Sequence, residues 1–184
     1  TMSGAMILFF VATAAWAAER PYLAVIEKVA GAVGFYSDTG KQLGLVKVGP
    51  FPHEAVLSSD GKLLYVSDNG VLWMTEDSLG YKAISVVDVR AMKKVRDIDL
   101  GRFQRPHGIA LVNGHLFATT ERPFGLIMVD PAASKVVRDF NVKGKSPHMV
   151  IPAADGKRVF VSNADSDSLA VVDLSTGQTK VIPA

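Results

Sequence analysis

The sequence contains no cysteine among its 184 residues. Disulfides, thiolate metal sites and a cysteine nucleophile are therefore excluded. An excess of charge of one sign is also lacking, because 20 basic and 18 acidic residues give a formal net charge of +2, and the basic residues form no stripe. A nucleic-acid partner is not expected, since binding to a phosphate backbone needs a concentrated positive surface.

The chain also lacks an apolar run of about 20 residues, the length needed to span a bilayer. Its longest apolar run is AMILFFVATAAWA, residues 5–17, which ends in the small-x-small pattern Ala15-Trp16-Ala17. This pattern is typical of a secretory signal peptide. We therefore predict a signal peptide over residues 1–17, a mature chain that is periplasmic or secreted, and no membrane span after cleavage. A buried first strand or helix is the alternative.

What the sequence does contain is a repeat. Three stretches share a Pro-His pair, a short apolar run, an Asp-Gly or Asn-Gly turn and a second apolar run. They are PHEAVLSSDGKLLYVSD, PHGIALVNGHLFATTE and PHMVIPAADGKRVFVSN, at residues 52–68, 106–121 and 147–163. Each is followed by a third apolar run that ends in Asp88, Asp130 or Asp173, at intervals of 42 and 43 residues (88 to 130, 130 to 173). A fourth strand-like run follows every time.

Four strands that recur at about forty residues are the pattern of an antiparallel β-propeller blade. A two-sheet sandwich would not repeat the same motif order three times. We predict an all-β propeller over residues 18–184. Its partial blade and three full blades span 21–49, 52–101, 106–144 and 147–184. The partial blade lacks its first strand, so we expect an incomplete ring of about three and three-quarter blades, the N-terminal part of a longer propeller. A four-bladed ring lacking one inner strand is the alternative.

Several short motifs resemble known families. LLYVSD and RVFVSN, preceded by SSDGK and AADGK and followed by VVD, resemble the YVTN-repeat propellers over about residues 21–184. This resemblance is specific for fold and poor for function. PHGIA followed by TE resembles the corresponding blade of the lactonase-like and virginiamycin B lyase-like seven-bladed propellers. That second resemblance implies opening of a cyclic lactone by elimination, with histidine, glutamate and a divalent metal such as Mg, Ca or Mn.

The order of the strands predicts where side chains meet. The innermost strand of a blade starts at the rim to which the second strand returns, so a residue before the first strand and one ending the second become neighbours. His107 and Glu121 occupy those two positions, fourteen residues apart (107 to 121). The candidates at the corresponding positions of the other blades are His53, Glu54, His148, Asp68 and Asn163. Pro-His as a loop signature of the repeat is the alternative for any one histidine.

Imidazole and carboxylate groups around one opening suit a divalent cation or proton transfer. Together with the lyase resemblance they imply His107 and Glu121 as catalytic residues, and Glu121, His148 and His53 as metal ligands. The residues predicted to contact a ligand are Glu54, Asp68, Trp73 and Asn163. Trp73 belongs to the long connection 69–83, which is expected to emerge at the same rim and to cover a ligand.

Two classes of function remain open. One is an exported, metal-assisted lyase or lactonase acting on a cyclic ester. The other is a non-catalytic exported propeller that binds a small molecule, a peptide, another protein or a cell-wall component. A redox or cofactor propeller is a weaker third possibility, because the sequence carries no haem or quinone motif.

Overall fold

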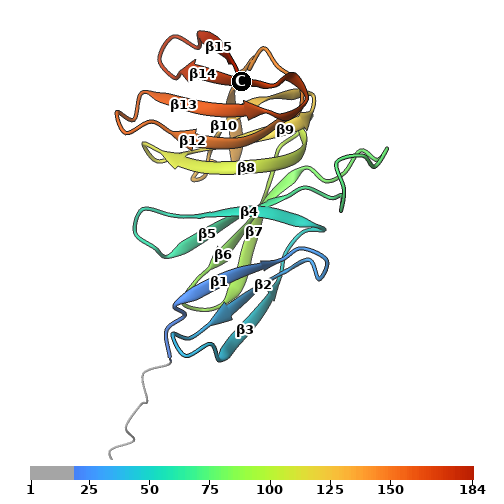
Figure 1. The fold of residues 1–184 in the computed structure, drawn as a ribbon. Coiled ribbons are helices and arrows are strands. Elements are labelled where there is room, and N and C mark those ends of the chain that lie inside the picture. The colour runs from blue at the N-terminus through green and yellow to red at the C-terminus, as the bar shows by residue number, and fades with distance from the viewer. Residues whose placement is uncertain (1–18) are drawn as a thin grey trace, which may run out of the picture.

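The computed structural model describes residues 19–184, so the predicted signal peptide lies outside the described residues. Fifteen strands form one three-stranded and three four-stranded antiparallel sheets, and a single 3-10 turn, η1 (Ala164–Ser166), is the only helical element between residues 19 and 184. The sheets follow one another along an arc (Figure 1). This architecture confirms the prediction of all-β propeller blades with an unclosed ring.

Each sheet is built from strands that are consecutive in the sequence. Sheet 1 consists of β1 (Leu23–Glu27), β2 (Ala32–Tyr36) and β3 (Gln42–Lys47). Sheet 2 consists of β4 (Pro52–Leu57), β5 (Leu63–Asp68), β6 (Ala83–Asp88) and β7 (Lys93–Asp99). Sheet 3 consists of β8 (Gln104–Val112), β9 (His115–Arg122), β10 (Phe124–Asp130) and β11 (Lys135–Phe140). Sheet 4 consists of β12 (Pro147–Pro152), β13 (Arg158–Asn163), β14 (Ser168–Asp173) and β15 (Thr179–Pro183).

The turn residues explain where the strands end. Asp88, Asp130 and Asp173 close the third strand of their sheets, and each carboxylate accepts hydrogen bonds from backbone N–H groups two or three residues further on. Such bonds stabilise a tight turn without help from other parts of the chain. The Asn113-Gly114 pair has positive φ at both residues, 49° and 80°, as a two-residue hairpin turn requires.

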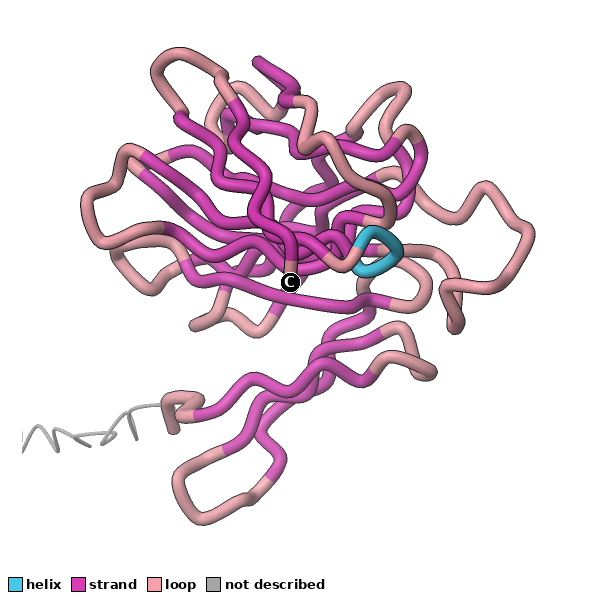
Figure 2. Tube along the Cα trace, turned by 45° about the horizontal axis from the view of Figure 1, so that its top comes forward, coloured by secondary structure: helices cyan, strands magenta, loops and turns pink. Residues whose placement is uncertain are grey.

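The sheets pack face to face, and the core lies between them. Three clusters of buried apolar residues occupy the seams between sheets 1 and 2, 2 and 3, and 3 and 4. Because an inner sheet is covered on both faces, its strands carry continuous apolar runs. Strands β4 and β12 both contact β8, so the innermost strands of sheets 2, 3 and 4 are neighbours. Strands dominate the fold, and the short helical turn lies near the C-terminal end of the chain (Figure 2).

No helix between residues 19 and 184 has the length and apolar character needed to cross a membrane.

Candidate functional site

Three histidine rings meet where the innermost strands begin. His53, His107 and His148 each follow the proline that opens or lies near the start of β4, β8 and β12. The ring centroid of His107 lies 4.3 Å from that of His53 and 3.9 Å from that of His148. Gly108 permits this close approach, since a Cβ atom there would lie 2.5 Å from the carbonyl oxygen of His148. The repeat therefore gathers one imidazole from each of three sheets.

Hydroxyl groups on the second strands of sheets 2 and 3 bond to the backbone of two of these histidines. Ser67 donates a 2.6 Å hydrogen bond to the carbonyl of His107, and Thr119 donates a 2.7 Å bond to that of His148. The same two hydroxyls accept N–H groups from their own sheets, those of Glu54 and Gly108. Each hydroxyl thus connects the innermost strand of its own sheet to the innermost strand of the following sheet.

Burial keeps the central ring neutral. His107 is 5% exposed, and burial, followed by the neighbouring His53, His148 and Lys28, lowers its pKa to about 3. Its Nδ1 atom is buried and has no hydrogen-bond partner among the described residues. An unpaired nitrogen at this depth is costly unless a ligand or water bonds to it.

His53 has a fixed ring orientation. Its Nδ1 lies 2.9 Å from the carbonyl oxygen of Phe51. Because a carbonyl only accepts hydrogen bonds, this contact needs a proton on Nδ1 and leaves Nε2 of the neutral ring as an acceptor. Burial lowers the pKa of His53, against the opposing effect of this hydrogen bond. Neutral rings are the form in which histidine donates a lone pair to a ligand.

Glu121 is bound to partners that the sequence analysis did not consider. Its carboxylate forms a buried ion pair with Arg105, at 3.3 Å between Nη1 and Oε2, and accepts a 3.4 Å bond from Nδ2 of Asn69. Arg105 also donates to the carbonyls of Met74, Glu76 and Ser78. Glu121 therefore neutralises the arginine that fastens the long loop to sheet 3.

The pairing register corrects one prediction. Pro52, Pro106 and Pro147 pair with Asp68, Thr120 and Asn163, respectively. The counterpart of Asp68 and Asn163 in sheet 3 is thus Thr120, and Glu121 lies one residue beyond it. Successive side chains of a strand point to opposite faces, so Glu121 and the pair Asp68 and Asn163 do not share a direction. The prediction that Glu121 is equivalent to Asp68 and Asn163 was wrong. It matched the last residues of the three motifs, whereas the equivalent residues are those that pair with the prolines.

Asp68 and Asn163 lie where their own sheet meets the connection from the preceding one. Asp68 is fully buried, accepts bonds from the backbone N–H of Gly49 and the hydroxyl of Ser85, and has a pKa that burial raises to about 7. Asn163 is 2% exposed and lies so near Gly144 that a Cβ there would be 2.3 Å from its Cγ. Both side chains face the sheet that precedes their own.

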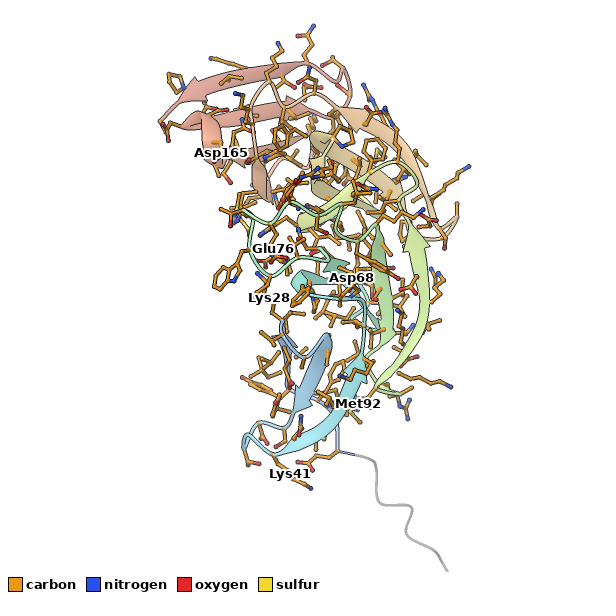
Figure 3. The ribbon with its side chains drawn as sticks, turned by 90° about the vertical axis from the view of Figure 1, so that its right-hand side faces the viewer. Lys28, Lys41, Asp68, Glu76, Met92 and Asp165 are labelled. Atoms are coloured by element: carbon orange, nitrogen blue, oxygen red, sulfur yellow. The ribbon has the colours of Figure 1, made fainter. Side chains whose placement is uncertain are left out.

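The predicted long loop is present and projects from the arc. It joins β5 to β6, and its backbone N–H groups at Leu72 and Trp73 bond to the carboxylate of Glu76. Trp73 is 66% exposed. Glu54 is half-buried at the start of β4. In Figure 3, Lys28, Glu76 and Asp165 lie along the same edge of the molecule.

An open cleft of about 710 Å³ lies beside this loop. Its lining comes from the long loop, from sheet 3 and from the connections next to β12 and β13 of sheet 4. The lining residues are Met74, Thr75, Arg105, Glu121, Arg122, Phe124, Ser146 and Asp165. The Nε atom of Arg105, which is 3% exposed, has no hydrogen-bond partner among the described residues. The cleft thus combines a buried ion pair with apolar surface, a lining suited to a small polar ligand.

The metal implied by the lyase resemblance fits these residues poorly. Mg, Ca and Mn prefer oxygen ligands, whereas three of the candidate donors are imidazoles and the carboxylate of Glu121 is engaged by Arg105 and Asn69. No group of three His, Cys, Asp or Glu side chains within residues 19–184 is arranged to hold a metal ion.

Sequence reasoning missed Arg105. Phe51, Arg105 and Ser146 stand at equivalent positions before Pro-His, and all three have positive φ, between 45° and 53°. A bulky residue in this backbone region is unusual and worth inspection. Among sheets 2, 3 and 4, only sheet 3 has a charged residue at this position, and Glu121 lies opposite it on the neighbouring strand β9. A charged residue before Pro-His, together with an acidic residue at the end of the second strand, was the signal in the sequence.

Comparisons with known proteins agree with the fold. No protein-family model matches the sequence, and no curated protein does either. A hydrazine synthase of Kuenenia stuttgartiensis matches with a TM-score of 0.71 and 22% identity, over 87% of this chain and 46% of that one. A streptogramin B lyase matches with a TM-score of 0.70 and 12% identity, over 88% of this chain and 50% of that one.

A third structure, the dihydro-heme d1 dehydrogenase NirN in complex with DHE, matches with a TM-score of 0.64 and 15% identity. The match covers 90% of this chain and 37% of that one. The chain therefore spans half or less of these three structures. At such identities the likeness concerns the fold alone, and the chain is a protein of β-propeller type.

Proposed function

We propose that this protein is an exported, ligand-binding propeller that holds a small polar molecule at the channel mouth. One observation carries the proposal: the ring of His107 lies against those of His53 and His148, and Arg105, two residues earlier in β8, forms a buried pair with Glu121 that borders an open cleft. The unpartnered Nδ1 of His107 and Nε of Arg105 supply a hydrogen-bonding nitrogen each. A ligand with both donor and acceptor groups would satisfy them.

Binding is favoured over acid–base catalysis because of the pKa of His107. A general base works best when its pKa lies near the operating pH. An imidazole with a pKa of about 3 is neutral at pH 7 but a weak base. A neutral, poorly basic ring is better suited to accept a hydrogen bond or to contact a ligand than to remove a proton.

The second candidate is a lyase or lactonase that opens a cyclic ester. It is favoured by the buried Arg105, two residues before His107 in β8, which could stabilise negative charge developing on an ester oxygen. In this proposal His107 acts as acid or base, and Glu121, His148 and His53 bind a divalent metal. Glu121 would first have to leave Arg105 and Asn69. The protein would then act on its substrate in the periplasm or outside the cell.

Thermal unfolding with added metal separates the two candidates. If a divalent site forms, Mg, Ca or Mn at a hundredfold excess over its dissociation constant should stabilise the fold by about 2.7 kcal/mol. The His107→Ala variant should lose that response. His115→Ala is the matched control, because His115 begins β9 at the other end of the same hairpin. An unchanged melt in all metals, for the parent protein, would count against the lyase.

A ligand screen tests binding directly. Trp73 is exposed in the loop beside the cleft, and the chain has only one other tryptophan, Trp16 in the predicted signal peptide. Fluorescence of the mature chain thus reports on the loop. Small lactones, carboxylic acids and short peptides should include a compound that changes this signal and loses affinity in His107→Ala but not in His115→Ala. Equal responses in both variants would contradict the proposed site.

A further inference from the structure

Sheets 1, 2 and 3 each pack one face against the sheet that follows in the sequence, and this face and its equivalent in sheet 4 are here called the forward face. Five apolar positions of the pairing register form this face. In sheet 2 they are Val56, Tyr65, Ile84, Val86 and Ile98. In sheet 3 the same positions hold Ala110, Phe117, Leu126, Met128 and Phe140. Because the same register positions are apolar in both sheets, the two sheets stack on their neighbours in the same way.

The forward faces of sheets 2 and 3 are covered. The face of sheet 2 packs against five residues of sheet 3, namely Ile109, Leu116, Ala118, Ile127 and Val129. The face of sheet 3 packs against the corresponding residues of sheet 4, namely Val150, Val159, Val161, Ala170 and Val172. Apart from Leu116, these partners are alanine or β-branched residues, so each sheet presents an apolar surface to the preceding one.

Sheet 4 carries the same forward face, with no sheet over it in the described chain. Its five residues are Ile151, Phe160, Leu169, Val171 and Ile182. Ile151 is 60% exposed and Ile182 is 42% exposed, whereas their counterparts Ala110 and Phe140 in sheet 3 are 6% and 4% exposed. Sheet 4 stands at the end of the arc (Figure 1). Apolar surface of this kind marks an interaction site.

A polar contact repeats in the same way. Ser67 and Thr119 donate to the carbonyl of the histidine in the following sheet. Ser162 stands at the equivalent position and accepts the N–H of Met149, as expected from the repeat. Between residues 19 and 184 its own hydroxyl proton has no acceptor. A further Pro-His strand would supply the carbonyl that it lacks.

A basic side chain on the fourth strand follows the same rule. Arg96 donates a 2.7 Å bond to the carbonyl of Pro131, and Arg138 donates a 2.9 Å bond to that of Leu174. Both acceptors directly follow the aspartate that closes the third strand of the next sheet. Lys180 occupies the equivalent place in β15, opposite Val171, and is exposed. The apolar, hydroxyl and basic positions of sheet 4 therefore all correspond to positions through which sheets 2 and 3 contact the sheet that follows them.

We propose that the forward face of sheet 4 is a docking surface for one further four-stranded propeller blade of this repeat type. The blade must present small and β-branched apolar residues, offer a backbone carbonyl to Ser162, and bring a turn carbonyl to Lys180. A second copy of this chain meets these needs only in part. Its free face at sheet 1 exposes Leu23, Val25 and Leu45 but belongs to a sheet with no Pro-His strand. This proposal stands independently of the ligand site.

The test extends the chain by one blade. A copy of residues 142–184 is placed after Pro183, which keeps the spacing of the repeat because Ile182 corresponds to Phe140. If the face is a docking surface, the extended chain should unfold in a single transition at a higher urea concentration than the 184-residue chain. Nearest-neighbour contacts stabilise repeat arrays in this way. Two separate transitions, with the first unchanged, would overturn the proposal.

Phe160→Ala and Phe117→Ala make the matched pair. Phe117 is 2% exposed and already covered, so its replacement should lower the urea midpoint by a similar amount in both chains. Phe160→Ala should have a small effect in the 184-residue chain and an effect as large as that of Phe117→Ala in the extended chain. The same small effect of Phe160→Ala in both chains would refute docking.

The 184-residue chain provides a second measurement if the extended chain does not fold. Ile151→Lys and Phe160→Lys together should leave its melting temperature nearly unchanged, whereas Phe117→Lys should unfold it. Equal damage from both would show that the face is already an internal contact and would overturn the proposal. A concentration-dependent dimer in light scattering, abolished by the double variant, would also overturn it in favour of a second copy.

Discussion

Sheets 3 and 4 are built from the same repeat but have different surroundings. Sheet 3 is covered on both faces and carries the buried Arg105–Glu121 pair at its rim. Sheet 4 is covered on one face, and Ser146 and Ala164 stand where sheet 3 has the arginine and the glutamate. The strands are equivalent, so the difference in chemistry comes from two substitutions at the rim and from the neighbour on each face.

The largest expected effect concerns the charged rim of sheet 3. Replacing Glu121 by Ala leaves Arg105 buried without its counter-charge, which should lower the free energy of unfolding by about 3–5 kcal/mol. Urea denaturation gives this value. Asp155→Ala is the control, because its pair with Arg158 lies at the surface of sheet 4, and it should change little. A mild effect of Glu121→Ala would show that water reaches the arginine.

Leucines at one register position distinguish the covered face from the free one. Leu126 in sheet 3 is fully buried, and Leu169 is its half-buried counterpart in sheet 4. Leu126→Ala should cost about 2–5 kcal/mol in unfolding free energy, because it leaves a cavity. Leu169→Ala should cost roughly 1 kcal/mol, since part of that side chain is already in water. Similar losses for the two variants would break the comparison.

Acidification should act on the histidine cluster. The pKa of His107 is lowered to about 3, below the ordinary value of 6.5, so the unfolded chain takes up a proton that the folded chain does not. The stability from this group is present above pH 6.5 and is lost as the pH falls towards 3. His107→Gln should flatten the dependence of the urea midpoint on pH over that range. An equally steep profile in the variant would mean that another group is responsible.

Asp68 should have the opposite sign. Its pKa is raised to about 7 from an ordinary value of 3.8, so the folded chain holds a proton that the unfolded chain has lost. Its contribution is fully present below about pH 4 and disappears as the pH rises through 7. Asp68→Asn, which copies the residue at the equivalent place in sheet 4, should remove this decline. If the variant and the parent decline together between pH 4 and 8, the assignment is wrong.

The smallest effect concerns the hydroxyl groups between sheets. Ser67→Ala removes a buried bond to the His107 carbonyl and should cost about 1 kcal/mol in unfolding free energy. Ser162→Ala should cost less, because its hydroxyl proton has no acceptor in the described chain. Chemical denaturation of the two variants side by side measures the difference. A larger loss for Ser162→Ala would imply a contact that the repeat does not predict.

The sequence alone determined the repeat, the strands and most of the turns. Period-two and continuous apolar patterns are local signals, and the aspartates that close the third strands form their bonds within a few residues. The position of the three histidines also followed, because each comes directly after the proline at or near the start of an innermost strand. The loop between β5 and β6 was evident from its extra residues.

Only the tertiary structure decided which side chains face one another. A bulge after each Pro-His pair sets the register, and that register moved Glu121 off the positions of Asp68 and Asn163 and placed it beside Arg105. Side-chain direction in a strand reverses with every residue, so an alignment error of one residue reverses the predicted surroundings. Whether a face is covered depends on the neighbouring sheet, which no local pattern encodes.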